Sequence, residues 1–212
     1  SPRVHRLMIP TALTSSGGRL FDVRDGLPFD ACQLIFAFGM MAWTGAFLNL
    51  ESTVTNNQLH ALFGQGVHAA SSTVVARRLL ARVAPGQRQH LRTYGALGAG
   101  VNLFGLIMGA VLGATCKWWG EGCGIARRAN EAIQSFTGQK AAWFARAESV
   151  PTGANMKVGL ELLTLRCAPW SPKCRNFPQG CWAAIAELLA VVEGVKARSP
   201  RAIVVENTAG LW

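Results

Sequence analysis

The feature that most constrains the fold is the stretch of residues 93–116, TYGALGAGVNLFGLIMGAVLGATC, which carries no charged side chain. A run of about 20 apolar residues is what an α-helix needs to cross a bilayer. Gly105, Gly109 and Gly113 recur at every fourth position, so they share one helix face and would let a second helix approach closely. We therefore expect a packed transmembrane helix, with a buried helix of a globular protein as the alternative.

The composition favours the same interpretation. The chain has 212 residues, enough for one domain, and half of them are hydrophobic. Charged residues make up 15%, against about 25% in typical globular domains. The net charge of +10 suits nucleic acid or anionic lipid. Because the basic residues flank apolar runs, we expect lipid and the other membrane subunits of a large complex as partners, and no nucleic acid.

Three further segments are candidates for spanning helices. Residues 31–50 lie between Asp30 and Glu51 with no charge inside, and residues 58–78 form a second, more polar candidate. Residues 182–196 are short and contain two glutamates, so they form either a fourth span or an amphipathic docking helix. The predicted fold class is all-α: a small multi-span membrane protein with three or four transmembrane helices.

The segments between and around these spans complete the expected organisation. Residues 1–28 read as a basic irregular arm, with the composition of an organelle transit peptide. Arginines crowd residues 77–92, which would face the inner side. An outer loop, residues 117–181, would hold an amphipathic surface helix at 130–148 and a Cys- and Pro-containing loop. Residues 198–212 form a tail.

Five cysteines are candidates for disulfides, because they gather in or beside the expected outer loop, where the environment can be oxidising. They are spaced unlike the short pairs of a zinc site, and no histidine lies near them, so we expect no metal. The pairing cannot be deduced from the sequence, and free thiols are the alternative. The candidates are Cys116, Cys123, Cys167, Cys174 and Cys181.

Two histidines in the second apolar segment suggest a bound pigment. His60 and His68 are eight residues apart and share a helix face. A neutral imidazole can bind the central metal of chlorophyll or haem. Bis-histidine haem would need a histidine on another span, so chlorophyll is the better candidate. Asn102 is a further candidate pigment ligand. Ordinary packing of these polar side chains is the alternative.

No catalytic motif stands out. The chain has no HExxH, GxSxG or P-loop, and Gly95, Gly98 and Gly100 fall inside the predicted span, where they do not support nucleotide binding. We therefore expect a non-catalytic accessory subunit of a photosystem or respiratory complex, in a thylakoid or inner mitochondrial membrane. The alternatives are a free-standing four-span protein with a disulfide-stapled outer loop for partner binding, and a small transporter or channel.

Overall fold

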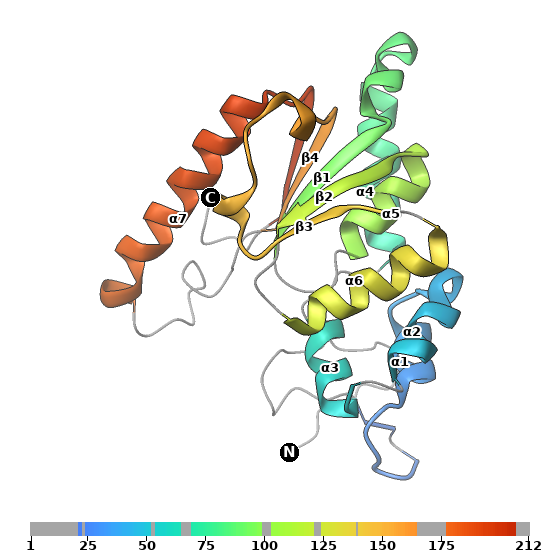
Figure 1. Cartoon of the computed structure of the whole chain (residues 1–212). Helices are drawn as coiled ribbons and strands as arrows, with labels where there is room; N and C mark the ends of the chain where they lie inside the picture. Colours follow the sequence, from blue (N-terminus) through green and yellow to red (C-terminus); the bar gives the residue numbers. More distant parts are fainter. Residues whose placement is uncertain are drawn as a thin grey trace.

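The computed structural model describes residues 21–22, 24–51, 54–64, 69–98, 103–120, 124–138, 140–164 and 177–206. Its centre is a five-stranded sheet in the order β3-β2-β1-β4-β5, with every neighbouring pair parallel (Figure 1). The strands are β1 (Thr93–Gly98), β2 (Thr115–Gly120), β3 (Ala142–Phe144), β4 (Leu160–Thr164) and β5 (Ala202–Glu206).

Helices surround this sheet. The α-helices are α1 (Ala31–Ala37), α2 (Thr44–Glu51), α3 (Asn56–Gly64), α4 (Ala69–Arg82), α5 (Leu103–Leu112), α6 (Gly124–Thr137) and α7 (Phe177–Arg198). The short 3-10 helices are η1 (Met41–Trp43), η2 (Pro85–Leu91), η3 (Ala147–Ser149) and η4 (Ala154–Met156).

The prediction of an all-α membrane protein is wrong. Residues 93–116 form β1, then α5, then the start of β2. With 10 residues, α5 is about 15 Å long, half the thickness of a bilayer core. In the described part of the chain, no helix combines the length and apolarity needed to cross a membrane. The membrane assignment and the thylakoid or mitochondrial-membrane location therefore lose their basis. Buried parallel strands read as unbroken apolar runs, which explains the error.

The other predicted spans are also divided or differently placed. Residues 31–50 contain α1, η1 and α2, with Gly39 at a positive φ of 69° between them. Residues 58–78 fall partly in α3 and partly in α4, and residues 182–196 lie within α7. The expected surface helix at 130–148 ends at Thr137 in α6 and is followed by β3, while the tail contains β5.

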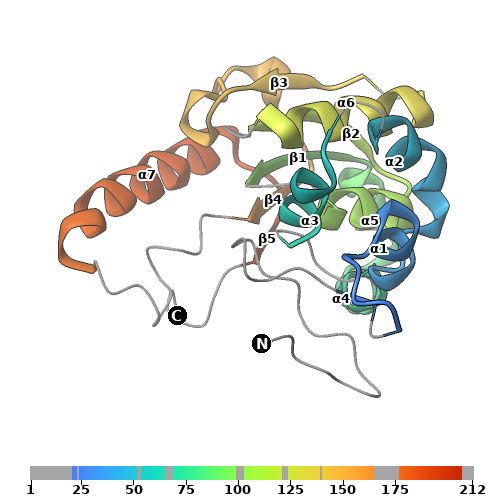
Figure 2. The same ribbon diagram turned by 90° about the horizontal axis from the view of Figure 1, so that it is seen from below.

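Each face of the sheet packs against a different helix layer. One face, with Tyr94, Ala96 and Trp119 among its buried side chains, packs against α4 and α5. The opposite face, with Leu97 and Trp118, packs against Val191 and Val195 of α7. Figures 1 and 2 show α7 on one side of the sheet and α4 and α5 on the other. This three-layer arrangement covers both faces, as an all-parallel sheet requires.

A second core lies outside α5 and α6, where α1, α2 and α3 gather below α6 in Figure 1. Phe63 of α3 is its centre: its ring centroid lies 5.2 Å from that of Phe38 and 5.1 Å from that of Phe47. Ile107 of α5 and Ala129 of α6 belong to the same buried cluster. The first three helices therefore form a cap on the outer surface of the helix layer.

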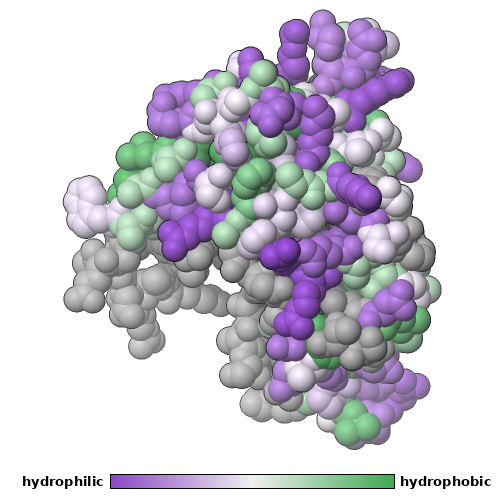
Figure 3. Space-filling view, viewed as in Figure 1, coloured by the Kyte–Doolittle hydropathy of each residue, from purple (hydrophilic) through white to green (hydrophobic). Residues whose placement is uncertain are grey.

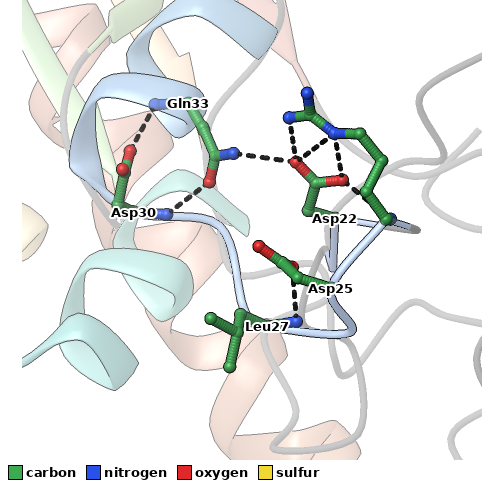
Figure 4. Close-up of polar contacts among 6 residues, drawn as sticks. Asp22, Asp25, Leu27, Asp30 and Gln33 are labelled. Carbon is green, nitrogen blue, oxygen red and sulfur yellow. Dashed lines mark hydrogen bonds and ion pairs between the residues drawn. The ribbon is translucent and has the colours of Figure 1, made fainter.

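The segment leading into this cap is held by local polar contacts (Figure 4). Asp30 caps α1: its carboxylate accepts from the Gln33 backbone N–H at 2.8 Å, and the Gln33 side chain accepts from the Asp30 N–H at 2.9 Å. Gln33 also donates to Asp22 at 3.2 Å. The Arg24 guanidinium pairs with Asp22 and holds the pKa of that carboxyl well below its usual range. These contacts connect the loop to the first turn of α1.

Candidate ligand site at the carboxyl edge of the sheet

The chain winds outward from the middle of the sheet in two directions. From β1 it proceeds to β2 and β3 on one side, and β4 and β5 lie on the other side of β1. The connections that leave β1 and β4 therefore diverge at the carboxyl ends of two adjacent strands. In open α/β sheets, ligands bind at such a switch point. The strand ends at this edge include Gly98, Gly120, Thr164 and Glu206.

Gly98 ends β1 at the switch point. Its φ of +155° is rarely adopted by other residues, and a Cβ built there would lie 2.3 Å from the carbonyl oxygen of Thr164. Only glycine therefore lets the ends of β1 and β4 come this close. In the sequence, Gly100 follows within residues 99–102, which precede α5 and lie outside the described residues.

The glycines predicted to contact a second membrane helix have other surroundings. Gly109 of α5 faces β1, because a Cβ there would lie 2.8 Å from Cε1 of Tyr94. Gly113 follows α5 with a positive φ of 62°, a conformation that glycine adopts without strain at the end of a helix. Gly105 is buried within α5. Gly109 thus brings α5 close to the strand beneath it.

Cys116 is one of two cysteines whose side chains are described, and both are free thiols. Its Sγ donates to the carbonyl oxygen of Trp118 at 3.4 Å, and it also hydrogen-bonds the Tyr94 side chain. Burial raises the pKa of Cys116 to about 12 and also raises the pKa of Tyr94. Cys116 is therefore a neutral packing group between β1 and β2 rather than an activated nucleophile.

The remaining disulfide candidates are not placed by the structure. Cys123, Cys167 and Cys174 lie outside the described residues. Cys181 belongs to α7, but the structure does not describe its side chain.

The candidate pigment ligands are not brought together by any described contact. His60 is buried in α3, and its Nε2 donates to the carbonyl oxygen of Phe29 at 2.8 Å, which makes that nitrogen unavailable to a metal. His68 and Asn102 lie outside the described residues. Within the described ranges, no cluster of three or more His, Cys, Asp or Glu side chains could hold a metal ion. The chlorophyll hypothesis stays a prediction.

Gly98 lies at the end of a central strand and not, as the sequence had suggested, inside a spanning helix. Gly100 lies outside the described residues. A strand followed by Gly-x-Gly and a helix, with an acidic residue about 20 positions later, is a signal for nucleotide binding. Glu121 stands at that distance from Gly100, directly after Gly120 of β2.

The strand order and the two-directional winding define a doubly wound α/β fold. Comparison with protein-family models and with curated proteins finds no match for this chain. The geometry of the switch point therefore carries the functional argument by itself.

Proposed function

We propose that this chain binds an adenosine-containing cofactor at the switch point between β1 and β4 and serves as the cofactor domain of a group-transfer enzyme. The observation that carries the proposal is the position of Gly98. Gly98 is the last residue of β1, the central strand, and sheets with this strand order bind ligands at the carboxyl ends of their strands. Because glycine has no side chain, the space at this edge is not filled by a Cβ. Backbone N–H groups can approach a ligand there.

A second feature suits the ribose of such a cofactor. In doubly wound domains, an acidic residue after the second strand accepts hydrogen bonds from the ribose hydroxyls. In this chain Glu121 follows Gly120, the last residue of β2, and β2 is the direct neighbour of β1. We assign ribose recognition to Glu121.

The glycine pattern bears on the cofactor class. The dinucleotide fingerprint is G-x-G-x-x-G, with the pyrophosphate at the helix N-terminus. Here Gly98 and Gly100 match, but Leu103 stands at the third position. We infer a cofactor without a pyrophosphate, of which S-adenosylmethionine is the representative. That cofactor supplies an electrophilic methyl group on a sulfonium, so the proposed reaction class is methyl transfer. The chain itself would bind and orient the adenosine.

Isothermal titration calorimetry of the full chain tests this proposal, with S-adenosylmethionine, S-adenosylhomocysteine, NAD and NADP as separate probes. We expect the first two to bind. Glu121→Gln should weaken binding tenfold or more, because hydrogen bonds to a charged group contribute about 1.5–3 kcal/mol. Glu148→Gln is the matched control, since Glu148 pairs with Arg146 on the surface. Binding of NAD alone would overturn the cofactor class, and binding of none would overturn the proposed function.

The earlier hypothesis, a non-catalytic subunit of a larger assembly, stays an untested alternative proposal. The spanning helices that supported this hypothesis are not found among the described residues. The net charge of +10 still supports it. Native purification separates the two proposals: a large particle with a pigment absorption band would favour the subunit. A small colourless particle that binds S-adenosylmethionine would favour the cofactor domain.

A further inference from the structure

Every strand of the sheet begins beside an exposed basic residue. Since all five strands are parallel, their first residues lie along one edge, opposite the proposed cofactor site. An exposed lysine or arginine occurs within the strand or up to three residues before it in each case. In spatial order from β3 to β5, these residues are Lys140, Lys117, Arg92, Lys157 and Arg201, which we call the basic edge.

The spacing of the basic edge is regular. Neighbouring strands lie about 4.8 Å apart, so five strand starts form a row about 19 Å long. Local contacts keep the row together: the Arg201 backbone N–H donates to the carbonyl oxygen of Gly159 at 3.0 Å, and the Gly159 N–H donates to the carbonyl oxygen of Thr93 at 3.1 Å. The starts of β1, β4 and β5 are thereby tied at one level.

The helices that lead into β1 extend the same surface. Residues 69–98 contain no acidic residue, and Arg77, Arg78, Arg82 and Arg88 are exposed on α4 and η2. Arg88 donates to the carbonyl oxygens of Leu80 and Val83, which fixes its stem against the end of α4. Figure 3 shows hydrophilic side chains gathered over this end of the molecule, at the top of the view.

Two acidic side chains of the described residues near this edge are ion-paired with other groups. Glu161 in β4 is buried and paired with Arg198, and Glu193 of α7 pairs with Lys196 at 2.8 Å. Among the described residues, no ion pair involves a member of the basic edge. Within the described part of the chain, the positive charge of the row is therefore not compensated by an ion pair.

We propose that the basic edge binds the phosphate backbone of a nucleic acid. A duplex carries one charge per about 1.7 Å of its axis when both strands are counted, so the length that a row of about 19 Å spans carries about 11 phosphates, some of which face the row. Exposed Gln87, Gln89 and His90 beside the row add hydrogen-bonding groups that suit phosphate and sugar. A membrane surface fits less well, because interfacial binding also needs inserted apolar side chains. The exposed Trp, Phe and Leu side chains of the described residues lie within residues 21–48 and on α7, and the exposed apolar side chains nearer the row are the β-branched Val74, Val75, Ile203 and Val205.

The test is fluorescence anisotropy of a labelled 30-base-pair duplex of mixed sequence, titrated with the full chain over a series of salt concentrations. The variant Lys117→Gln/Lys157→Gln/Arg201→Gln removes three charges of the row. We expect its affinity for the duplex to fall at least tenfold at low salt. The slope of log K against log salt should become shallower by about 2.7, since each phosphate contact contributes about 0.9.

The matched control is Arg24→Gln/Arg128→Gln/Arg146→Gln, which removes three exposed charges from elsewhere on the molecule. Circular dichroism should show that both variants fold as the unmodified chain does. Equal loss of affinity in the two triple variants would overturn the proposal, because it would show a diffuse charge effect. Absence of duplex binding, or tighter binding to phosphatidylserine vesicles than to the duplex, would also overturn it. S-adenosylmethionine binding should be unchanged in both variants, so the two proposals fail separately.

Discussion

Arg198 and Glu161 form a bidentate ion pair inside the protein, with Nε to Oε1 at 2.7 Å and Nη2 to Oε2 at 3.0 Å. Their side chains are 2% and 0% exposed. The Arg198 guanidinium also lies 5.0 Å from the ring centroid of Trp118 and donates to the carbonyl oxygen of Val150. The pair joins the end of α7 to the start of β4. Each buried charge depends on the other for compensation.

Removing one partner of this pair should destabilise the fold strongly. We expect Arg198→Met to lower the free energy of unfolding by about 3–5 kcal/mol, because Glu161 would remain buried without compensation. Urea denaturation measures the effect. The double variant Arg198→Met/Glu161→Leu should recover most of the loss. As the control, Glu193→Gln removes the exposed pair with Lys196 and should change stability by less than about 1 kcal/mol. If Arg198→Met lowered the free energy of unfolding as little as Glu193→Gln does, this account would be contradicted.

Gly95 should not accept even a methyl group. A Cβ at this position would lie 2.1 Å from Cζ2 of Trp118, whose ring crosses β1. We expect Gly95→Ala to cost about 1–3 kcal/mol or more through overpacking. Gly86→Ala is the control, because nothing lies within 4 Å of a Cβ there. Thermal unfolding of both variants gives the comparison, and a Gly95→Ala variant as stable as Gly86→Ala would count against the packing described here.

The Cys116 thiol should make the protein less stable at alkaline pH. Its pKa is about 12 in the folded chain against an ordinary value of 9.0. The contribution of the buried neutral Cys116 thiol to the free energy of unfolding is therefore complete below pH 9 and is lost between pH 9 and 12. The reason is that the thiol ionises at a lower pH in the unfolded chain than in the folded chain. The loss should be about 1.4 kcal/mol per pH unit.

Urea denaturation at pH 8.5, 9.5 and 10.5 measures this slope. Cys116→Ala should reduce the decline between pH 9.5 and 10.5 relative to the unmodified protein. The control is Cys32→Ala, which removes an exposed thiol and should leave the slope unchanged. Identical slopes in all three proteins would show that Cys116 is not held as a buried thiol.

Local helix signals were readable in the sequence. The segment 58–78 was expected to be helical, and its described residues lie in α3 and α4. The predicted last helix, residues 182–196, lies within α7, which begins at Phe177 and ends at Arg198. These features depend on local periodicity and on proline and glycine, which act over a few residues.

The sheet could not be read in the same way. Tyr94 to Leu97 are buried on both faces, so β1 lacks the alternation that marks a half-buried strand. The strand is defined by neighbours that are distant in sequence: β4 pairs with it, and Trp118 packs over Gly95. With β1 taken for part of a helix, Gly98 could not be recognised as the end of a central strand.

The most direct test of the central claim, a nucleoside cofactor site at the carboxyl edge of β1, is amide hydrogen exchange of the full chain with and without saturating S-adenosylmethionine. The account predicts slower exchange in peptides that cover residues 97–103 and 119–124, with no change at residues 85–93, where the opposite edge begins. Protection confined to the opposite edge, or identical exchange with and without the cofactor, would contradict it.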